Sequence, residues 1–294
     1  MNPRLSALGR LAIFVILAFV VFPAKKRWLR AALHDSGGVA VYIVDHLVEL
    51  AAVLTFAAIM ARLERRSLAA YGLPWRAALR SRFWQGAGAG IGALTLLYLG
   101  LAATGALHLG LSSGHLLLSA ILGIVYALLF VLLAVREEFL YRGYGMFTGT
   151  QIAGFWFAAV ASTAWFTWSH SDNSRESPLG LANVALFALV ACLMLRRTGD
   201  LWMPIGFHAA WDWGQTYLYG VGDSGHPPAP GHLIASTVSP AAPAWLSGGL
   251  VGPEGSVLCT ALIVALGIVY ASVLRCVRYP ERDRPPTPEA DRGG

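Results

Sequence analysis

The strongest constraint on the fold of this chain is an apolar run, residues 116–135, that is long enough to cross a bilayer and leads into Glu137, Glu138 and Arg142. Ionised side chains at the end of a membrane helix, or inside it, are costly, so they are usually kept as a pair, as the lining of a wet cavity, or for chemistry. On a helix, Glu138 and Arg142 face each other, whereas Glu137 points about 100° away. The pattern predicts that the arginine holds Glu138 and leaves Glu137 free.

The composition extends this interpretation to the whole chain. Of its 294 residues 56% are hydrophobic and 13% are charged, and the mean hydropathy is +0.58, which excludes a soluble domain of this size. We predict an all-α fold, a polytopic membrane helix bundle of about eight transmembrane helices. The third span is rich in Gly and Ala, which permits close approach of a neighbouring helix. The predicted spans are residues 11–22, 38–60, 86–109, 115 to the glutamate pair, 152–170, 181–195, 204–221 and 257–274.

The cations lie between these runs. Lys and Arg number 22 against 16 Asp and Glu, but membrane topology and anionic lipid headgroups account for the excess, so we expect a lipid bilayer and no nucleic acid as partner. The positive-inside rule places the arginine-rich loop 62–82, Arg196 with Arg197, and residues 275–278 in the cytoplasm, which makes the C-terminus cytoplasmic. The same topology places the basic residues 25–30 on the outer side of the membrane, which violates the positive-inside rule. The first run lacks a cleavage site and is read as a retained span or a surface-lying anchor.

The second predicted span carries Asp45, His46 and Glu49. Because Asp45 and Glu49 share one helix face, we expect them to look into the bundle rather than at lipid. A buried polar contact that fixes helix packing is favoured over a catalytic role. The three cysteines have no CxxC spacing, so the sequence indicates neither a disulfide framework nor a thiolate metal site.

Three polar clusters fall within residues 115–221. The first is the acid pair with its arginine. In the second, Phe166 stands one helical turn before His170 and can pack beneath the imidazole, and in the third, His208 and Asp212 share a helix face. Each cluster alone is compatible with packing. Several titratable groups on three helices of one bundle point to a functional site, because burying them together is expensive.

These side chains can activate water. A carboxylate in a site of low dielectric constant is a competent general base, and an imidazole beside it can share the proton or orient the water. A second imidazole can donate to the oxyanion that develops when water attacks an amide. Glu137, His170 and His208 would equally make a zinc site with an open fourth position, and the residue types leave both alternatives open. The sequence lacks the HExxH motif of soluble zincins and the GxSxG nucleophile elbow.

The three clusters also resemble the motifs of a known family. EExxxR at residues 137–142, FxxxH at 166–170 and HxxxD at 208–212 are similar, in that order, to the motifs of the intramembrane CAAX-processing and bacteriocin-processing peptidases, the group that contains the type II CAAX prenyl endopeptidases. The segment RRTGDLWMPIGFH, residues 196–208, resembles the lead into the third motif, and the resemblance covers about residues 115–215.

The resemblance implies a hydrolase. Glu137 and His170 would activate water, and His208 with Asp212 would stabilise the oxyanion. The residues that would support the site are Glu138, Arg142 and Phe166. Because the family has also been described as metalloproteases, the resemblance implies zinc as an alternative, held by Glu137, His170 and His208.

The third motif of the family ends in Asn or Asp, and this chain has Asp at position 212. An amide donates a hydrogen bond, but an ionised aspartate cannot. Asp212 would either have to be protonated or orient His208, as a carboxylate does for a catalytic or ligating imidazole, and we predict the orienting role.

The resemblance divides the chain into N-terminal transmembrane helices (1–114), a peptidase-like core (115–221), and a C-terminal part (222–294) with an outside loop, the last span and a disordered tail. We predict an intramembrane endopeptidase that cleaves a peptide bond at the cytoplasmic face, with the C-terminus of a peptide or protein as substrate, prenylated or not. The composition and short loops favour a bacterial inner membrane. The alternatives are a transporter or proton relay, and a catalytically vestigial scaffold or immunity protein.

The turn after the fourth span sets the depth of the site. A turn near Gly149 would leave Glu137 and His170 about 12 Å out of register along the bundle axis, so either the helices protrude unequally or a kink at a nearby glycine closes the gap. We expect the helix of the glutamate pair to continue past Arg142, and the pocket to open toward the cytoplasmic side. The candidate kinks are Gly143, Gly145 and Gly154.

Overall fold

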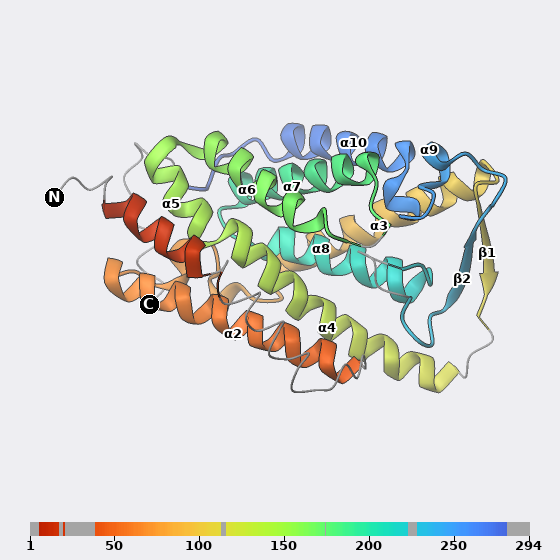
Figure 1. Ribbon diagram of the computed structural model, residues 1–294, viewed down its shortest axis with the longest axis horizontal. Coiled ribbons are helices and arrows are strands. Elements are labelled where there is room, and N and C mark those ends of the chain that lie inside the picture. Colours follow the sequence, from red (N-terminus) through yellow and green to blue (C-terminus); the bar gives the residue numbers. More distant parts are fainter. Residues whose placement is uncertain are drawn as a thin grey trace.

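The computed structural model describes residues 6–17, 20, 39–112, 116–173, 175–222 and 228–280. In this part the chain forms a helix bundle with a short β-ribbon at one end (Figure 1). The main helices are α2 (Val39–Glu64), α3 (Ser81–Ala103), α4 (Leu116–Arg142), α5 (Tyr144–Ala153), α6 (Phe155–His170), α7 (Pro178–Thr198), α8 (Trp202–Trp213) and α10 (Val257–Val273). The smaller elements are a helix at Ser6–Leu17, α9 (Ala244–Ser247), a π-helical turn at Gly214–Leu218, and 3-10 turns at Leu68–Tyr71, Trp75–Ala77 and Pro253–Gly255.

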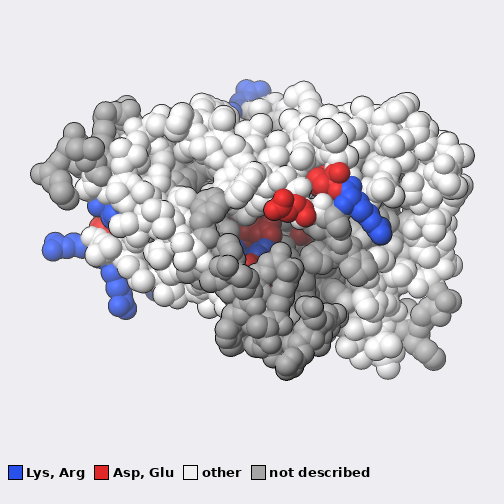
Figure 2. All heavy atoms as spheres, viewed as in Figure 1, with Lys and Arg blue, Asp and Glu red and all other residues white. Residues whose placement is uncertain are grey.

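The bundle is that of an integral membrane protein. Four described helices are long and apolar enough to cross a bilayer, namely Val44–Glu64, Ser81–Ala103, Leu116–Ala153 and Pro178–Thr198. The other predicted spans coincide with shorter helices, of 16 residues in α6, 12 in α8 and 17 in α10. Figure 2 shows cations gathered at the left end of the face on view, the end at which α2 finishes. The fold class predicted from the sequence is confirmed.

Helices α3 and α8 run side by side in the same direction, and their backbones approach closely where each helix has a glycine. A Cβ atom built on Gly86 would lie 2.0 Å from the carbonyl oxygen of Met203, and one built on Gly206 would lie 2.0 Å from the carbonyl oxygen of Phe83. Neither position has room for a side chain. The close approach predicted from the Gly-rich third span is therefore made to α8, the helix that carries His208.

The connection between α7 and α8 fixes where α8 begins. Its Leu201 N–H donates to the carbonyl oxygen of Gly72 at 2.8 Å, and the carboxylate of Asp200 accepts from the Trp202 N–H at 3.1 Å. Asp200 also pairs with Arg82 in the first turn of α3. Burial raises the pKa of Asp200, and the positive charge of Arg82 opposes this shift. The start of α8 is thus tied to α3 and to the loop before it.

Gly154, and not Gly149, makes the turn between the helices that carry Glu137 and His170. After α4 ends, Gly143 breaks the helix and α5 continues in a new direction as far as Ala153. Gly154 has a φ of 91°, in a region that only glycine occupies readily, and α6 starts at the next residue. Glu137 lies 17 residues before this turn and His170 lies 16 residues after it. The predicted turn at Gly149 was wrong, and the two residues reach similar depth.

A β-ribbon replaces the end of the predicted third span. Helix α3 ends at Ala103, and β1 (Leu107–Leu111) pairs antiparallel with β2 (Ile234–Val238), with Leu107 opposite Val238. The sequence indicates this strand by an alternation of leucines with other residues, at positions 107, 109 and 111. The ribbon closes the end of the bundle opposite to the end of α2 (Figure 1).

Several predictions concern residues outside the described ranges. The predicted first span is described as far as Leu17 and at Val20, where Ser6–Leu17 is helical. The basic segment 25–30, the start of the fourth span at His115, part of the outside loop (223–227) and the tail from residue 281 lie outside.

The α3–α8 contact makes a testable prediction. Gly86→Ala should destabilise the protein by about 1–3 kcal/mol, because the added methyl group overlaps the backbone of α8. Gly88→Ala is the matched control, because Gly88 lies on the opposite face of α3 and no atom of the described residues lies within 4 Å of its Cβ position. Chemical unfolding in detergent micelles measures both variants. Equal stability of the two would contradict the close approach.

Candidate active site

Glu138 is the centre of the buried polar network. The guanidinium of Arg142 donates to Glu138 Oε1 at 2.7 Å, and both side chains are 0% exposed. Nδ1 of His208, on α8, lies 2.8 Å from the same oxygen. This confirms that Arg142 holds Glu138, as predicted, and adds an imidazole from a second helix to the pair. One carboxylate therefore joins α4 to α8.

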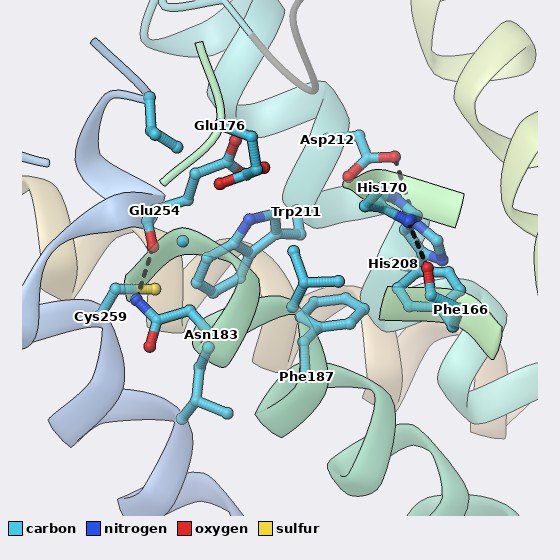
Figure 3. A pocket seen from close by; sticks show the side chains of 14 residues that line it. Phe166, His170, Glu176, Asn183, Phe187, His208, Trp211, Asp212, Glu254 and Cys259 are labelled. Atoms are coloured by element: carbon cyan, nitrogen blue, oxygen red, sulfur yellow. Dashed lines mark hydrogen bonds and ion pairs between the residues drawn. The ribbon is translucent and has the colours of Figure 1, made fainter. Parts of the chain in front are cut away.

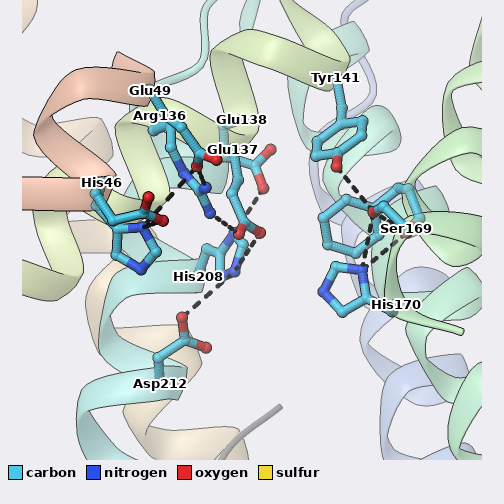
Figure 4. A network of polar contacts seen from close by, with 12 residues as sticks. His46, Glu49, Arg136, Glu137, Glu138, Tyr141, Ser169, His170, His208 and Asp212 are labelled. Atoms are coloured by element: carbon cyan, nitrogen blue, oxygen red, sulfur yellow. Dashed lines mark hydrogen bonds and ion pairs between the residues drawn. The ribbon is translucent and has the colours of Figure 1, made fainter. Parts of the chain in front are cut away.

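Glu137 is not free, contrary to the prediction. Its Oε1 accepts a hydrogen bond from Nη2 of Arg136, whose Nη1 donates to Glu49 of α2 (Figure 4). The other oxygen, Oε2, lies 3.8 Å from Nε2 of His208. The sequence analysis overlooked Arg136, because adjacent residues on a helix point apart. The sequence did contain an indication: Arg136 is a third ionised residue beside the acid pair, and its side chain is long enough to fold back onto Glu137.

Both nitrogens of His208 face carboxylates. Nδ1 contacts Glu138, while Nε2 lies 3.4 Å from Oδ2 of Asp212 as well as facing Glu137. An imidazole with an acceptor at each nitrogen is fully satisfied when both carry a proton. The contact with Asp212 was predicted, but the shorter hydrogen bond that fixes the ring comes from Glu138. Asp212 lies on the side of the ring that Glu137 also faces.

His170 is held by its own helix and by α4. Its Nδ1 lies 2.8 Å from the carbonyl oxygen of Phe166 and 3.3 Å from the Ser169 hydroxyl, which accepts from Tyr141 at 2.8 Å. Because a carbonyl oxygen only accepts, Nδ1 carries a proton, and in the neutral ring Nε2 is therefore the acceptor. Figure 4 shows His170 opposite the group formed by Glu137 and His208.

Phe166 packs as predicted beneath the imidazole of His170, with ring centroids 4.3 Å apart. The guanidinium of Arg142 lies 4.6 Å from the centroid of the same ring. Such a cation–π contact stabilises a buried arginine. Phe166 therefore connects the second motif to the first.

A cavity of about 540 Å³, its open mouth included, adjoins these residues. His170, His208 and Asp212 form one wall, and the aromatic rings of Phe187 and Trp211 lie beside them (Figure 3). The far side carries Glu176, Asn183 and Glu254.

The cavity lies away from the arginine-rich end, so the expected opening toward that end was wrong. Its lining includes the last turns of α6, the first turns of α7, the second half of α8 and the start of α10. Arg196 and Arg197, in contrast, are in the last turn of α7. The turn at Gly154 explains the difference, because it places the whole of α5 on the arginine-rich side of the site.

A shared metal ion requires ligand atoms that converge. Among the described residues, the group of potential ligands whose atoms all lie within 4.8 Å of one another is Asp45, His46 and Glu49. Glu137 and His208 approach each other, at 3.8 Å, but His170 does not complete such a group with them. Glu49 is paired with Arg136 of α4, a partly buried polar contact of the predicted kind, although the sequence did not indicate its partner. In this arrangement the three predicted zinc ligands do not fit one ion.

The comparisons with known proteins agree with the motifs. Residues 119–214 match the family described as type II CAAX prenyl endopeptidase Rce1-like. The matched segment begins in α4 and ends just after α8, so it contains all three motifs. The resemblance seen in the sequence is therefore confirmed for this segment. No curated protein and no solved structure matches the chain.

The buried pair makes a prediction on stability. Arg142→Met leaves Glu138 charged and buried without its cation, so it should destabilise the protein by about 3–5 kcal/mol in chemical unfolding in micelles. The double variant Glu138→Gln with Arg142→Met buries no unpaired carboxylate and should recover part of the loss. A double variant less stable than Arg142→Met would contradict the pairing.

Proposed function

We propose that the protein is an intramembrane endopeptidase of the CAAX-processing type, which hydrolyses a peptide bond with water activated by Glu137 and His170. The observation that carries this proposal is the position of His208, whose Nε2 faces Glu137 on the edge of a cavity that His170 also lines. The match of residues 119–214 to a family of prenyl endopeptidases supports the same reaction class. His208, oriented by Asp212, stabilises the oxyanion, and Glu138, Arg142 and Phe166 support the site.

Water is activated by two acceptors that approach from different helices. Oε2 of Glu137 is the oxygen not bonded to Arg136, and Nε2 of His170 is the ring nitrogen other than the one at the Phe166 carbonyl oxygen. A water molecule between them gives up one proton, and its oxygen forms a bond to the carbonyl carbon of the substrate. The proton passes to the amide nitrogen as the C–N bond breaks, so the site returns to its first state.

The oxyanion is stabilised by the imidazole of His208. Glu138 fixes the ring through Nδ1, which directs the Nε2–H toward the cavity. At 3.4 Å, Asp212 binds this N–H only weakly, so the developing oxyanion can take over as acceptor. Asp212 thereby keeps the donor aimed before the substrate arrives.

The substrate that fits this site is an extended peptide near its C-terminus. The rings of Phe166, Phe187 and Trp211 line the cavity beside His208 and can pack against an apolar side chain or a prenyl group. The distribution of arginines supports an inner bacterial membrane with the C-terminus in the cytoplasm.

The activity is tested with Glu137→Gln. Purified protein in micelles is given an internally quenched peptide that ends in a CAAX sequence, with or without a farnesyl group on its cysteine. Losing the general base should lower kcat by about 100- to 10,000-fold, with an unchanged unfolding midpoint. Full cleavage by the variant would remove Glu137 from the mechanism. Flux of a solute through proteoliposomes without cleavage would support the transporter instead.

The zinc alternative has its own test. The spacing of Glu137, His170 and His208 supports water activation without a metal, so cleavage should survive dialysis against EDTA and 1,10-phenanthroline. The measurement is the initial rate before and after dialysis, with the metal content of the same sample. Loss of the rate and its recovery on adding Zn²⁺ would assign the three residues to a metal site instead.

A further inference from the structure

Helix α2 lies outside the segment that matches the family, yet it contacts the candidate site through a buried chain of charges. Glu49 on α2 accepts from Nη1 of Arg136, and Nη2 of the same guanidinium donates to Glu137. The three side chains are 13%, 13% and 14% exposed, so water screens them little. Figure 4 shows Arg136 between the two carboxylates. The arginine is therefore shared by a catalytic candidate and a distant helix.

The way in which Arg136 is shared decides which oxygen of Glu137 is available. A guanidinium that faces a single carboxylate prefers two parallel hydrogen bonds, one to each oxygen. Here Glu49 holds Nη1, so Glu137 receives only Nη2, at Oε1. The second oxygen, Oε2, keeps its place 3.8 Å from Nε2 of His208. Without Glu49, Arg136 would be drawn to both oxygens of Glu137.

We propose that Glu49 is a positioning residue of the active site, which acts through Arg136 and keeps Oε2 of Glu137 open to the nucleophilic water. This inference rests on the proposed hydrolase function, and it adds α2 to the working parts of the site. Glu49 touches neither the substrate nor the water. Its effect on the reaction passes through the guanidinium.

A positioning role differs measurably from helix packing. A glutamate that only joined α2 to α4 would affect stability and leave the kcat of the folded protein unchanged. A glutamate that acts through Arg136 affects the rate only while the guanidinium is there to be held. The two roles therefore differ in the coupling between substitutions at positions 49 and 136.

The experiment measures kcat and KM of four proteins with the quenched CAAX peptide in micelles: the wild type, Glu49→Gln, Arg136→Gln and the double variant. Glu49→Gln should lower kcat by about tenfold or more, with KM within about twofold, because the misplaced group acts on the reacting water and not on peptide binding. In the Arg136→Gln background the same substitution should change kcat by at most about twofold.

Glu64→Gln is the matched control. Glu64 is also a glutamate of α2 and also accepts from an arginine, Arg10, at 2.9 Å, but it is the last residue of the helix, whereas Glu49 lies near the middle. Its substitution should leave kcat unchanged. If Arg136→Gln fails to fold, Arg136→Lys serves as the second background, because a single ammonium group cannot bridge the two carboxylates as a planar guanidinium does.

Each outcome separates this inference from the proposed function. Independent, multiplicative losses in kcat would overturn it, since Glu49 would then not act through Arg136. Wild-type kcat in Glu49→Gln, with Glu137→Gln inactive, would also overturn it while leaving the hydrolase proposal intact. Cleavage by Glu137→Gln would reject the hydrolase mechanism and the positioning role together.

Discussion

The structure depends on one buried carboxylate. Glu138 is shared by Arg142, on its own helix, and by His208, on α8, and neither acid nor arginine is exposed. A charge in the interior of a membrane bundle is tolerated only when it is paired and hydrogen-bonded. Arg142 supplies the charge, and His208 supplies a further hydrogen bond only if α8 lies against α4. The glycines of α3 and α8 allow this hydrogen bond, because they let α8 pack so closely against α3 that the imidazole of His208 reaches Glu138.

Holding Glu138 determines what the neighbouring acid can do. Consecutive residues of α4 point about 100° apart, so a fixed Glu138 directs Glu137 to the other nitrogen of the same imidazole. Arg136 and Glu49 then secure one oxygen of Glu137, and the second oxygen faces His208. Three features support the site. The Glu138–Arg142 ion pair orients the acids, Arg136 positions Glu137, and a cavity with aromatic walls can receive the substrate. The proposed hydrolysis uses each of them once.

Much of the site could be predicted because its contacts are local on helices. Glu138 with Arg142, Phe166 with His170, and His208 with Asp212 are each four residues apart, a spacing that brings side chains together on any helix. Contacts between helices had no such signal. The partnership of Arg136 with Glu49 depends on α2 packing against α4, and nothing in the sequence distinguished Gly149 from Gly154 as the turn. Because that turn sets the depth of His170, the side on which the cavity lies could not be deduced either.

The most direct test of this account is ¹⁵N NMR of histidine-labelled protein in micelles, with the signals of His208 assigned by comparison with His208→Gln. The hydrogen bond to Glu138 predicts that Nδ1 of His208 carries a proton, and that Glu138→Gln shifts its resonance while that of His170 stays in place. An unprotonated Nδ1, or a His208 spectrum that does not respond to Glu138→Gln, would show that the carboxylate does not join α4 to α8, and the site described here would not exist.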